Sequence, residues 1–132
     1  MAPELVRPLA GIHVLVIDDD ERDRFFMRAA LQAWGALVTA AGASEAAGAV
    51  LAADVIVCDV PTAEAVGLDF VERLSRTHSR AGRRGVPMIA VMPASPRGGE
   101  RHIAARFHRF ITKPVIGDEL RQMVRDLISD RR

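Results

Sequence analysis

Short apolar runs of strand length alternate along the chain with longer segments in which apolar residues recur every three or four positions. The run DVIVCDV (residues 54–60) is almost entirely apolar, which is typical of a strand covered by helices on both faces. The pattern predicts strands over residues 12–17, 36–41, 54–60, 86–92 and 109–112. Strands that alternate with helices in this way predict an α/β fold with a doubly wound, five-stranded parallel sheet.

The first and last predicted helices have clear apolar stripes. The first begins at Arg22 and ends at Gly35, and its stripe consists of Phe25, Phe26, Ala29, Ala30, Leu31 and Trp34. The last covers residues 117–128, with a stripe of Leu120, Val124, Leu127 and Ile128. Both stripes are expected to face the sheet.

Three further helices are predicted between the strands. Ser44 is expected to cap a helix that runs through EAAGAVLA (45–52). After the third strand, PTAEAV (61–66) is expected to be a loop that leads to Gly67 and a helix over residues 68–77. The third of these helices is expected over residues 100–107. No apolar stretch approaches the roughly 18 residues that a membrane span needs, so no membrane insertion is expected.

Acidic residues fall where the first and third predicted strands end. Asp18 and Asp19 follow the first strand, and Asp59 ends the third. Because the carboxyl ends of parallel strands share one edge of a sheet, we expect these carboxylates to converge there. If the acids after the first strand served only to cap the first helix, one acid would be enough, and Asp59 would have no explanation. Oxygen ligands of this kind suit Mg²⁺, whose coordination shell a phosphate can complete.

Lys113 is the single lysine of the chain, and the other seventeen strongly basic side chains are arginine. It directly follows the predicted fifth strand, so it belongs to the same edge of the sheet as the acids. A lysine ammonium is compact and can move between a carboxylate and a phosphoryl oxygen, whereas the planar guanidinium of arginine fits a tight site poorly. Lys113 is therefore a candidate functional residue.

Size, charge and cysteine content narrow the class of protein. A chain of 132 residues, 49% hydrophobic and 27% charged, is typical of one globular domain. Its formal net charge of +1 gives no general reason to expect nucleic acid as a partner. Cys58 is the single cysteine and is expected to be a small buried hydrophobe. A chain without disulfides fits a cytoplasmic location.

Four motifs in this order resemble the receiver domain of two-component response regulators. They are HVLVIDDD, VIVCD with Gly67 eight residues later, VPMIAV and FITKPV. The chain is most similar to the receivers of hybrid histidine kinases. The resemblance implies a flavodoxin-like fold with strand order 2-1-3-4-5. It covers residues 10–129 as a single domain, with short tails at 1–9 and 130–132 and no output domain expected.

The resemblance also implies roles for individual residues. Asp59 matches the phosphoacceptor, which attacks the phosphorus of a phosphohistidine. Asp18 and Asp19 match the pair that holds Mg²⁺ directly or through water, and the backbone carbonyl of Pro61 matches a further metal ligand. Lys113 matches the lysine that bridges the acceptor and the phosphoryl group. The expected partners are a histidine kinase or histidine phosphotransfer protein and a downstream protein target; no enzymatic activity beyond phosphoryl acceptance is expected.

The sequence departs from the receiver pattern at several positions. Met92 stands where receivers usually carry a threonine or serine, and a thioether cannot donate a hydrogen bond to a phosphoryl oxygen. Phe110 occupies the position of the usual switching aromatic, without a hydroxyl. Pro61 has a fixed φ that limits how its carbonyl can be aimed. Pro114, after Lys113, is a candidate for a cis peptide bond, which is common in receivers.

Two functions follow from these observations. The first is a Mg²⁺-dependent receiver that is phosphorylated on Asp59 and has altered switching because of Met92. The alternative is a pseudo-receiver, which acts as a protein-interaction module independently of phosphorylation, with Met92 and Phe110 serving only in core packing. Other enzymes of similar fold are disfavoured. A haloacid-dehalogenase-type phosphatase needs a second aspartate at Pro61, and a flavodoxin phosphate loop would not carry three aspartates.

Overall fold

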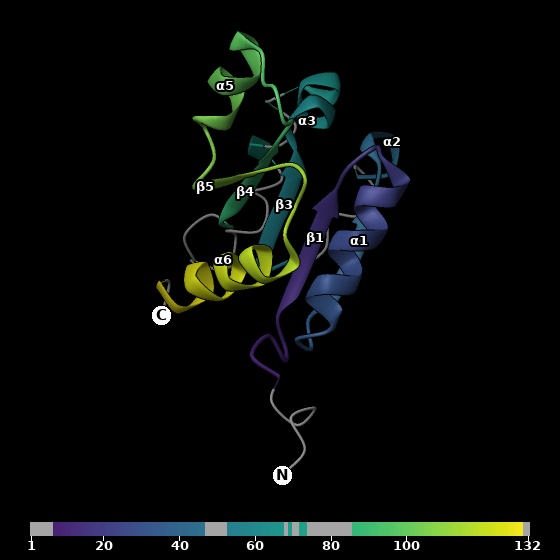
Figure 1. Cartoon of the computed structure of the whole chain (residues 1–132), viewed down its shortest axis with the longest axis vertical. Coiled ribbons are helices and arrows are strands. Elements are labelled where there is room, and N and C mark those ends of the chain that lie inside the picture. Colours follow the sequence, from purple (N-terminus) through teal and green to yellow (C-terminus); the bar gives the residue numbers. More distant parts are fainter. Residues whose placement is uncertain (1–6, 47–52, 68, 70–71, 74–85, 131–132) are drawn as a thin grey trace.

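The computed structural model of the chain describes residues 7–46, 53–67, 69, 72, 73 and 86–130. The strands are β1 (His13–Ile17), β2 (Leu37–Ala41), β3 (Val55–Asp59), β4 (Met88–Met92) and β5 (Arg109–Thr112). The helices are α1 (Glu21–Gln32), α2 (Ala43–Ala46), α3 (Val60–Val66), α5 (Gly98–Ala104) and α6 (Gly117–Asp130). All the strands are parallel, in the order β2-β1-β3-β4-β5 (Figure 1). This arrangement confirms the predicted fold class.

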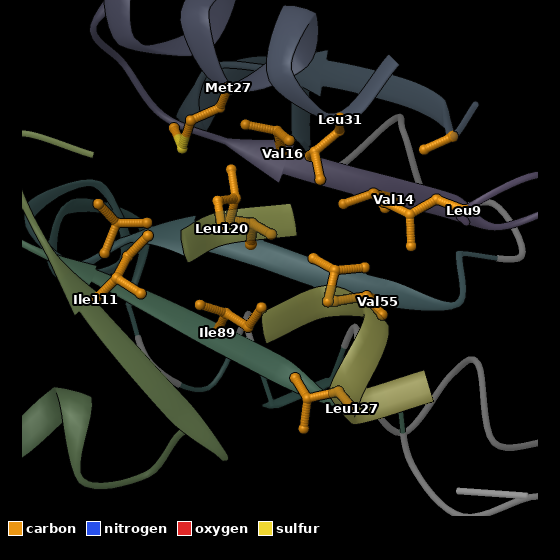
Figure 2. Packing of buried hydrophobic residues seen from close by; sticks show 14 residues of the cluster. Leu9, Val14, Val16, Met27, Leu31, Val55, Ile89, Ile111, Leu120 and Leu127 are labelled. Carbon is orange, nitrogen blue, oxygen red and sulfur yellow. The ribbon is translucent and has the colours of Figure 1, made fainter. Parts of the chain in front are cut away.

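Alternate residues of the central strands point to opposite faces of the sheet, where helices cover them. Val14 and Val16 of β1 belong to the core beneath α1 and α6, whereas Leu15 and Ile17 pack on the face covered by α2, α3 and α5. Figure 2 shows the first of these cores, with contributions labelled from Met27, Leu31, Val55, Ile89, Ile111, Leu120 and Leu127. The predicted inward stripe of the last helix is confirmed.

Cys58 is fully buried on the second face, as expected for a small hydrophobic residue. Burial raises the pKa of its thiol, and the neighbouring carboxylate of Asp59 raises it further. The thiolate form, which is the reactive form of cysteine, is therefore disfavoured at neutral pH.

The apolar stripe of α1 differs from the prediction. Phe25 and Phe26 are exposed, with relative accessibilities of 64% and 46%. The buried residues of this helix are Met27, Ala30 and Leu31, which follow the i, i+3, i+4 spacing of one helix face. The predicted stripe is therefore confirmed at Ala30 and Leu31, wrong at Phe25 and Phe26, and lacked Met27.

Two local predictions after β2 and β3 are also corrected. Residues 61–66, expected to be a loop, belong to α3. Asp59 caps this helix through its side chain, and Pro61 lies in its first turn, so both favoured start signals are present. Ser44 lies inside α2, which begins at Ala43, instead of capping it.

The ends of the expected domain also carry ordered structure. Leu9, within the expected N-terminal tail, is buried in the core, and its N–H donates to the carbonyl of Trp34. Most of the helix expected over 68–77 and of the second half of 45–52 lies outside the described residues. In the part of the chain that is described, no helix is both long enough and apolar enough to cross a bilayer.

Candidate functional site

The carboxyl edge of the sheet gathers the predicted residues because each follows or ends a parallel strand. Asp18 comes directly after β1, Asp59 is the last residue of β3, and Lys113 comes directly after β5. The ends of β3 and β5 flank β4, and the end of β1 lies on the other side of β3. Asp18 and Asp59 are buried, with 1% and 5% of their surface accessible.

Lys113 binds the carboxylates at this edge. Its Nζ lies 2.9 Å from Oδ1 of Asp59 and 3.2 Å from Oδ2 of Asp18. It also donates a 2.6 Å hydrogen bond to Oδ2 of Asp23, in the first turn of α1. Burial alone would lower the pKa of Lys113, but the hydrogen bonds with Asp23 and Asp59 outweigh it and raise that pKa. Lys113 is therefore a permanent cation.

The charged form of Asp18 is disfavoured by its burial. Burial raises its pKa from the usual 3.8 to about 6, and the nearby charge of Asp59 adds to the rise. A hydrogen bond from the N–H of Asp20 to Oδ1 and the charge of Lys113 oppose it. Oδ2 of Asp18 is buried and, among the described residues, receives no hydrogen bond of acceptable geometry despite its closeness to Lys113. This oxygen is available to a further cation.

Asp59 has partners on both carboxylate oxygens. Oδ1 contacts Lys113, whereas Oδ2 accepts hydrogen bonds from the backbone N–H of Thr62 at 3.0 Å and from its hydroxyl at 2.8 Å. The Thr62 hydroxyl in turn accepts a 3.0 Å hydrogen bond from the N–H of Asp19. Thr62 therefore connects the segment after β1 to the carboxylate that ends β3.

Asp19 and Asp20 are exposed and serve the ends of helices in this structure. Oδ1 of Asp19 accepts a 2.7 Å hydrogen bond from the N–H of Ala43, at the start of α2. Oδ1 of Asp20 accepts from the N–H of Asp23 and caps α1, and this hydrogen bond lowers the pKa of Asp20. Helix capping thus accounts for two of the three acids after β1, but not for Asp18.

The residues present fit a divalent cation through two carboxylates. Within the described ranges, no three His, Cys, Asp or Glu side chains are grouped so that they could hold a metal ion. Asp18 and Asp59 remain, and Mg²⁺ commonly binds through one or two carboxylates and several waters. The unbonded, buried Oδ2 of Asp18 supports this fit. The carbonyl of Pro61 lies in the first turn of α3, where regular helix geometry directs it along the helix and away from the carboxylates.

The two atypical switch positions lie on neighbouring strands: Met92 ends β4 opposite Thr112, and Phe110 lies opposite Ala90. Met92 is buried, whereas Phe110 is 62% exposed. Both line a surface hollow of about 470 Å³, together with Thr112, Pro96, Arg101, Ala104 and Ala105. The Lys113–Pro114 peptide bond is cis.

Sequence reasoning missed Asp23 and Thr62, which contact Lys113 and Asp59 respectively. Each had a signal. Thr62 lies three residues after Asp59, the spacing at which an N-cap carboxylate accepts from the backbone. Asp23 lies four residues after Asp19 in a predicted helix, but the acidic cluster gave no reason to pair it with a residue ninety positions away.

Replacing Thr62 with valine tests how much its hydroxyl stabilises the folded state. Valine keeps the shape but leaves Asp59 without one donor, and a hydrogen bond to a charged group contributes about 1.5–3 kcal/mol. We expect the free energy of unfolding in urea at pH 7 to fall by about 2 kcal/mol. Thr62→Ser retains the hydroxyl and should lose clearly less; equal losses in the two variants would contradict a stabilising hydroxyl.

Comparisons with known proteins agree with this fold. A family model described as the response regulator receiver domain matches residues 14–125. An uncharacterized 14.6 kDa protein from Leptolyngbya boryana is 32% identical over 124 residues, which cover 90% of this chain and 92% of that protein.

Solved structures show the same fold. The Mg²⁺-complexed receiver domain of the histidine kinase CKI1 from Arabidopsis thaliana has a TM-score of 0.73 and 22% identity, covering 92% of this chain and 95% of that one. NtrX from Brucella abortus, in complex with ATP, has a TM-score of 0.73 and 20% identity. The match covers 90% of this chain but 27% of NtrX, so the chain corresponds to one part of that longer protein. Together with the family match, the parallel sheet and its acidic carboxyl edge assign this chain to the response regulator receiver family.

Proposed function

We propose that this receiver accepts a phosphoryl group on Asp59 from the phosphohistidine of a histidine kinase or phosphotransfer protein, in a Mg²⁺-dependent reaction in the cytoplasm. It then acts on a downstream protein target. The observation that carries the proposal is the placement of a buried carboxylate, Asp59, 2.9 Å from the chain's one lysine and beside a second buried carboxylate, Asp18. Such a site places a nucleophile beside a fixed cation at the carboxyl edge of the sheet.

The residues act by positioning and by electrostatics. An oxygen of Asp59 attacks phosphorus, a P–O bond forms, and the P–N bond to the donor imidazole breaks, with its electron pair passing to the imidazole nitrogen. Lys113 is close enough to Asp59 to contact the equatorial phosphoryl oxygens as their charge spreads in the transition state. Its raised pKa keeps it charged throughout.

Asp18 and Asp59 would hold Mg²⁺, with Asp19 as a further ligand through water. When bound, the ion supplies charge neutralisation of the phosphoryl oxygens. The carbonyl of Pro61 joins the ligand set only if the first turn of α3 opens, because its helical conformation directs it elsewhere.

Switching is altered because Met92 fills the end of β4 with a side chain that cannot donate to a phosphoryl oxygen. Among the described residues, the hydroxyl of Thr62 lies 2.8 Å from Oδ2 of Asp59. Phe110 is already exposed, so an inward movement of this ring would have to enter the hollow that it shares with Met92.

Intact-mass spectrometry after incubation with acetyl phosphate and Mg²⁺ tests the proposal. We expect a single phosphoryl adduct that is absent in Asp59→Asn and absent when the metal is chelated. A second donor, monophosphoimidazole, matches the chemistry of phosphohistidine. No adduct from either donor would reject phosphoryl acceptance.

The second candidate function is a protein-interaction module that works without phosphorylation. It is favoured by the contacts that already occupy both oxygens of Asp59, and by the use of Asp19 to begin α2. In that case Asp59→Asn would leave binding to the downstream partner unchanged.

A further inference from the structure

The ammonium of Lys113 is surrounded by as many carboxylates as it has N–H donors. An ammonium has three donors, and the carboxylates of Asp18, Asp23 and Asp59 lie within 3.2 Å of Nζ. A phosphoryl oxygen on Asp59 would compete with these carboxylates for the same three donors. The proposed function therefore involves competition for this nitrogen.

The three carboxylates differ in how easily they can leave. Side chains of Asp18 and Asp59 are 1% and 6% accessible, so neither can exchange the ammonium for water. Asp23 has 39% of its side chain accessible, and a released carboxylate there would be hydrated. A buried carboxylate without a partner is far more costly than an exposed one. Asp23 is thus the partner whose release is least costly.

Asp23 is also the partner that holds Lys113 most firmly. Its 2.6 Å contact is the shortest of the three, and it has hydrogen-bond geometry. The contact with Asp18 lacks that geometry, since Oδ2 of Asp18 receives no such bond within the described chain. Asp23 therefore holds one donor of the ammonium on α1 while Nζ stays 2.9 Å from Oδ1 of Asp59.

We propose that Asp23 is a positioning residue that restrains phosphorylation: its carboxylate holds Lys113 in the unmodified protein, and a phosphoryl oxygen displaces it. The inference rests on the proposed function. Asp23 does not contact the reacting atoms, and it acts through Lys113. A carboxylate at this place competes with the phosphoryl group for the same donor and also repels it.

The rate of modification by acetyl phosphate and Mg²⁺ tests this inference, measured by intact-mass spectrometry for the whole chain. Asp23→Asn keeps the size of the side chain and removes its charge. We expect a rate about tenfold higher than in the wild type, which corresponds to 1.4 kcal/mol. Glu21→Gln is the matched control, because Glu21 is an exposed acid in the same first turn and removes the same charge from the helix. Its rate should stay within about twofold of the wild type.

Two further readouts separate restraint from a structural role. Asp23→Glu restores a carboxylate and should return the rate toward that of the wild type. The free energy of unfolding should fall slightly in Asp23→Asn, as an ion pair is lost, while the rate rises; a purely structural residue would not raise the rate. An unchanged or slower rate in Asp23→Asn, with an adduct still formed by the wild type, would overturn the inference alone. No adduct in any variant would overturn the proposed function and this inference with it.

Discussion

Replacing Lys113 with methionine is expected to lower the free energy of unfolding at pH 7 by about 3–5 kcal/mol. Methionine has a similar length but carries no charge, so Asp18 and Asp59 would remain as two buried carboxylates without a cation. Removing one partner of a buried ion pair is costly because the other charge stays desolvated. Urea unfolding with a chelator present measures this loss directly.

Lowering the pH should reduce the loss of stability that Lys113→Met causes. The folded-state pKa of Asp18 is already raised by burial, and without Lys113 it loses a charge that lowers it. A carboxylate of raised pKa contributes stability below its unfolded pKa and loses it as the pH rises through its folded pKa. The variant should therefore differ less from the wild type at pH 5 than at pH 7. Arg109→Met removes the same charge from β5, but from an exposed ion pair with Asp130, and should change stability by less than about 1 kcal/mol. An equal loss at both pH values would contradict the carboxylate mechanism.

Asp18→Asn should make the metal-free protein more stable at pH 7. Burial and the charge of Asp59 raise the pKa of Asp18 from 3.8 to about 6. One pKa unit corresponds to 1.36 kcal/mol, so ionised Asp18 lowers the stability at neutral pH by about 2–3 kcal/mol relative to acid. Asparagine keeps an acceptor for the N–H of Asp20 without the charge.

The pH dependence identifies the cause of that gain. Below about pH 3, Asp18 is protonated in both the folded and the unfolded state, and the variant should have no advantage. The gain should appear as the pH rises from about 4 through 6, in urea unfolding curves recorded with a chelator. Asp20→Asn is the local control, since Asp20 is exposed and its pKa is lowered; it should give no gain. Adding Mg²⁺ should raise the stability of the wild type more than that of Asp18→Asn. A gain that is independent of pH would argue against relief of a buried charge.

The sequence was sufficient for the fold because every level of pattern agreed. Apolar strand runs, helical periodicity and the acids at strand ends all pointed to one parallel sheet, and the observed order β2-β1-β3-β4-β5 is the expected one. Lys113 does meet Asp18 and Asp59 at the sheet's carboxyl edge. Strand ends are fixed by the sheet, so residues counted from them are placed reliably.

Local side-chain partners were less predictable than the fold. Oδ1 of Asp19 accepts a hydrogen bond from the N–H of Ala43, whereas the expected role of Asp19 toward Mg²⁺ stays a prediction. Residues 61–66 carry the start signals of a helix, an acidic cap and a proline, although a loop was expected there. Asp23 escaped notice because a contact across ninety residues depends on the packing of α1 beside the end of β5, which periodicity does not describe.

Asp59 is at once the last residue of β3 and the N-cap of α3, and one of its oxygens accepts from the first turn of that helix. Negative charge at a helix N-terminus is stabilising, so the strength of this start depends on the ionisation of one side chain. Phosphorylation of Asp59 would convert its carboxylate into an acyl phosphate, whose carbonyl oxygen is neutral and whose phosphoryl oxygens carry the negative charge. Modification of Asp59 would therefore change the hydrogen bonding at the N-terminus of α3 directly, without movement of a separate switch side chain. Because β4 ends in Met92, α3 is the element whose start is affected first.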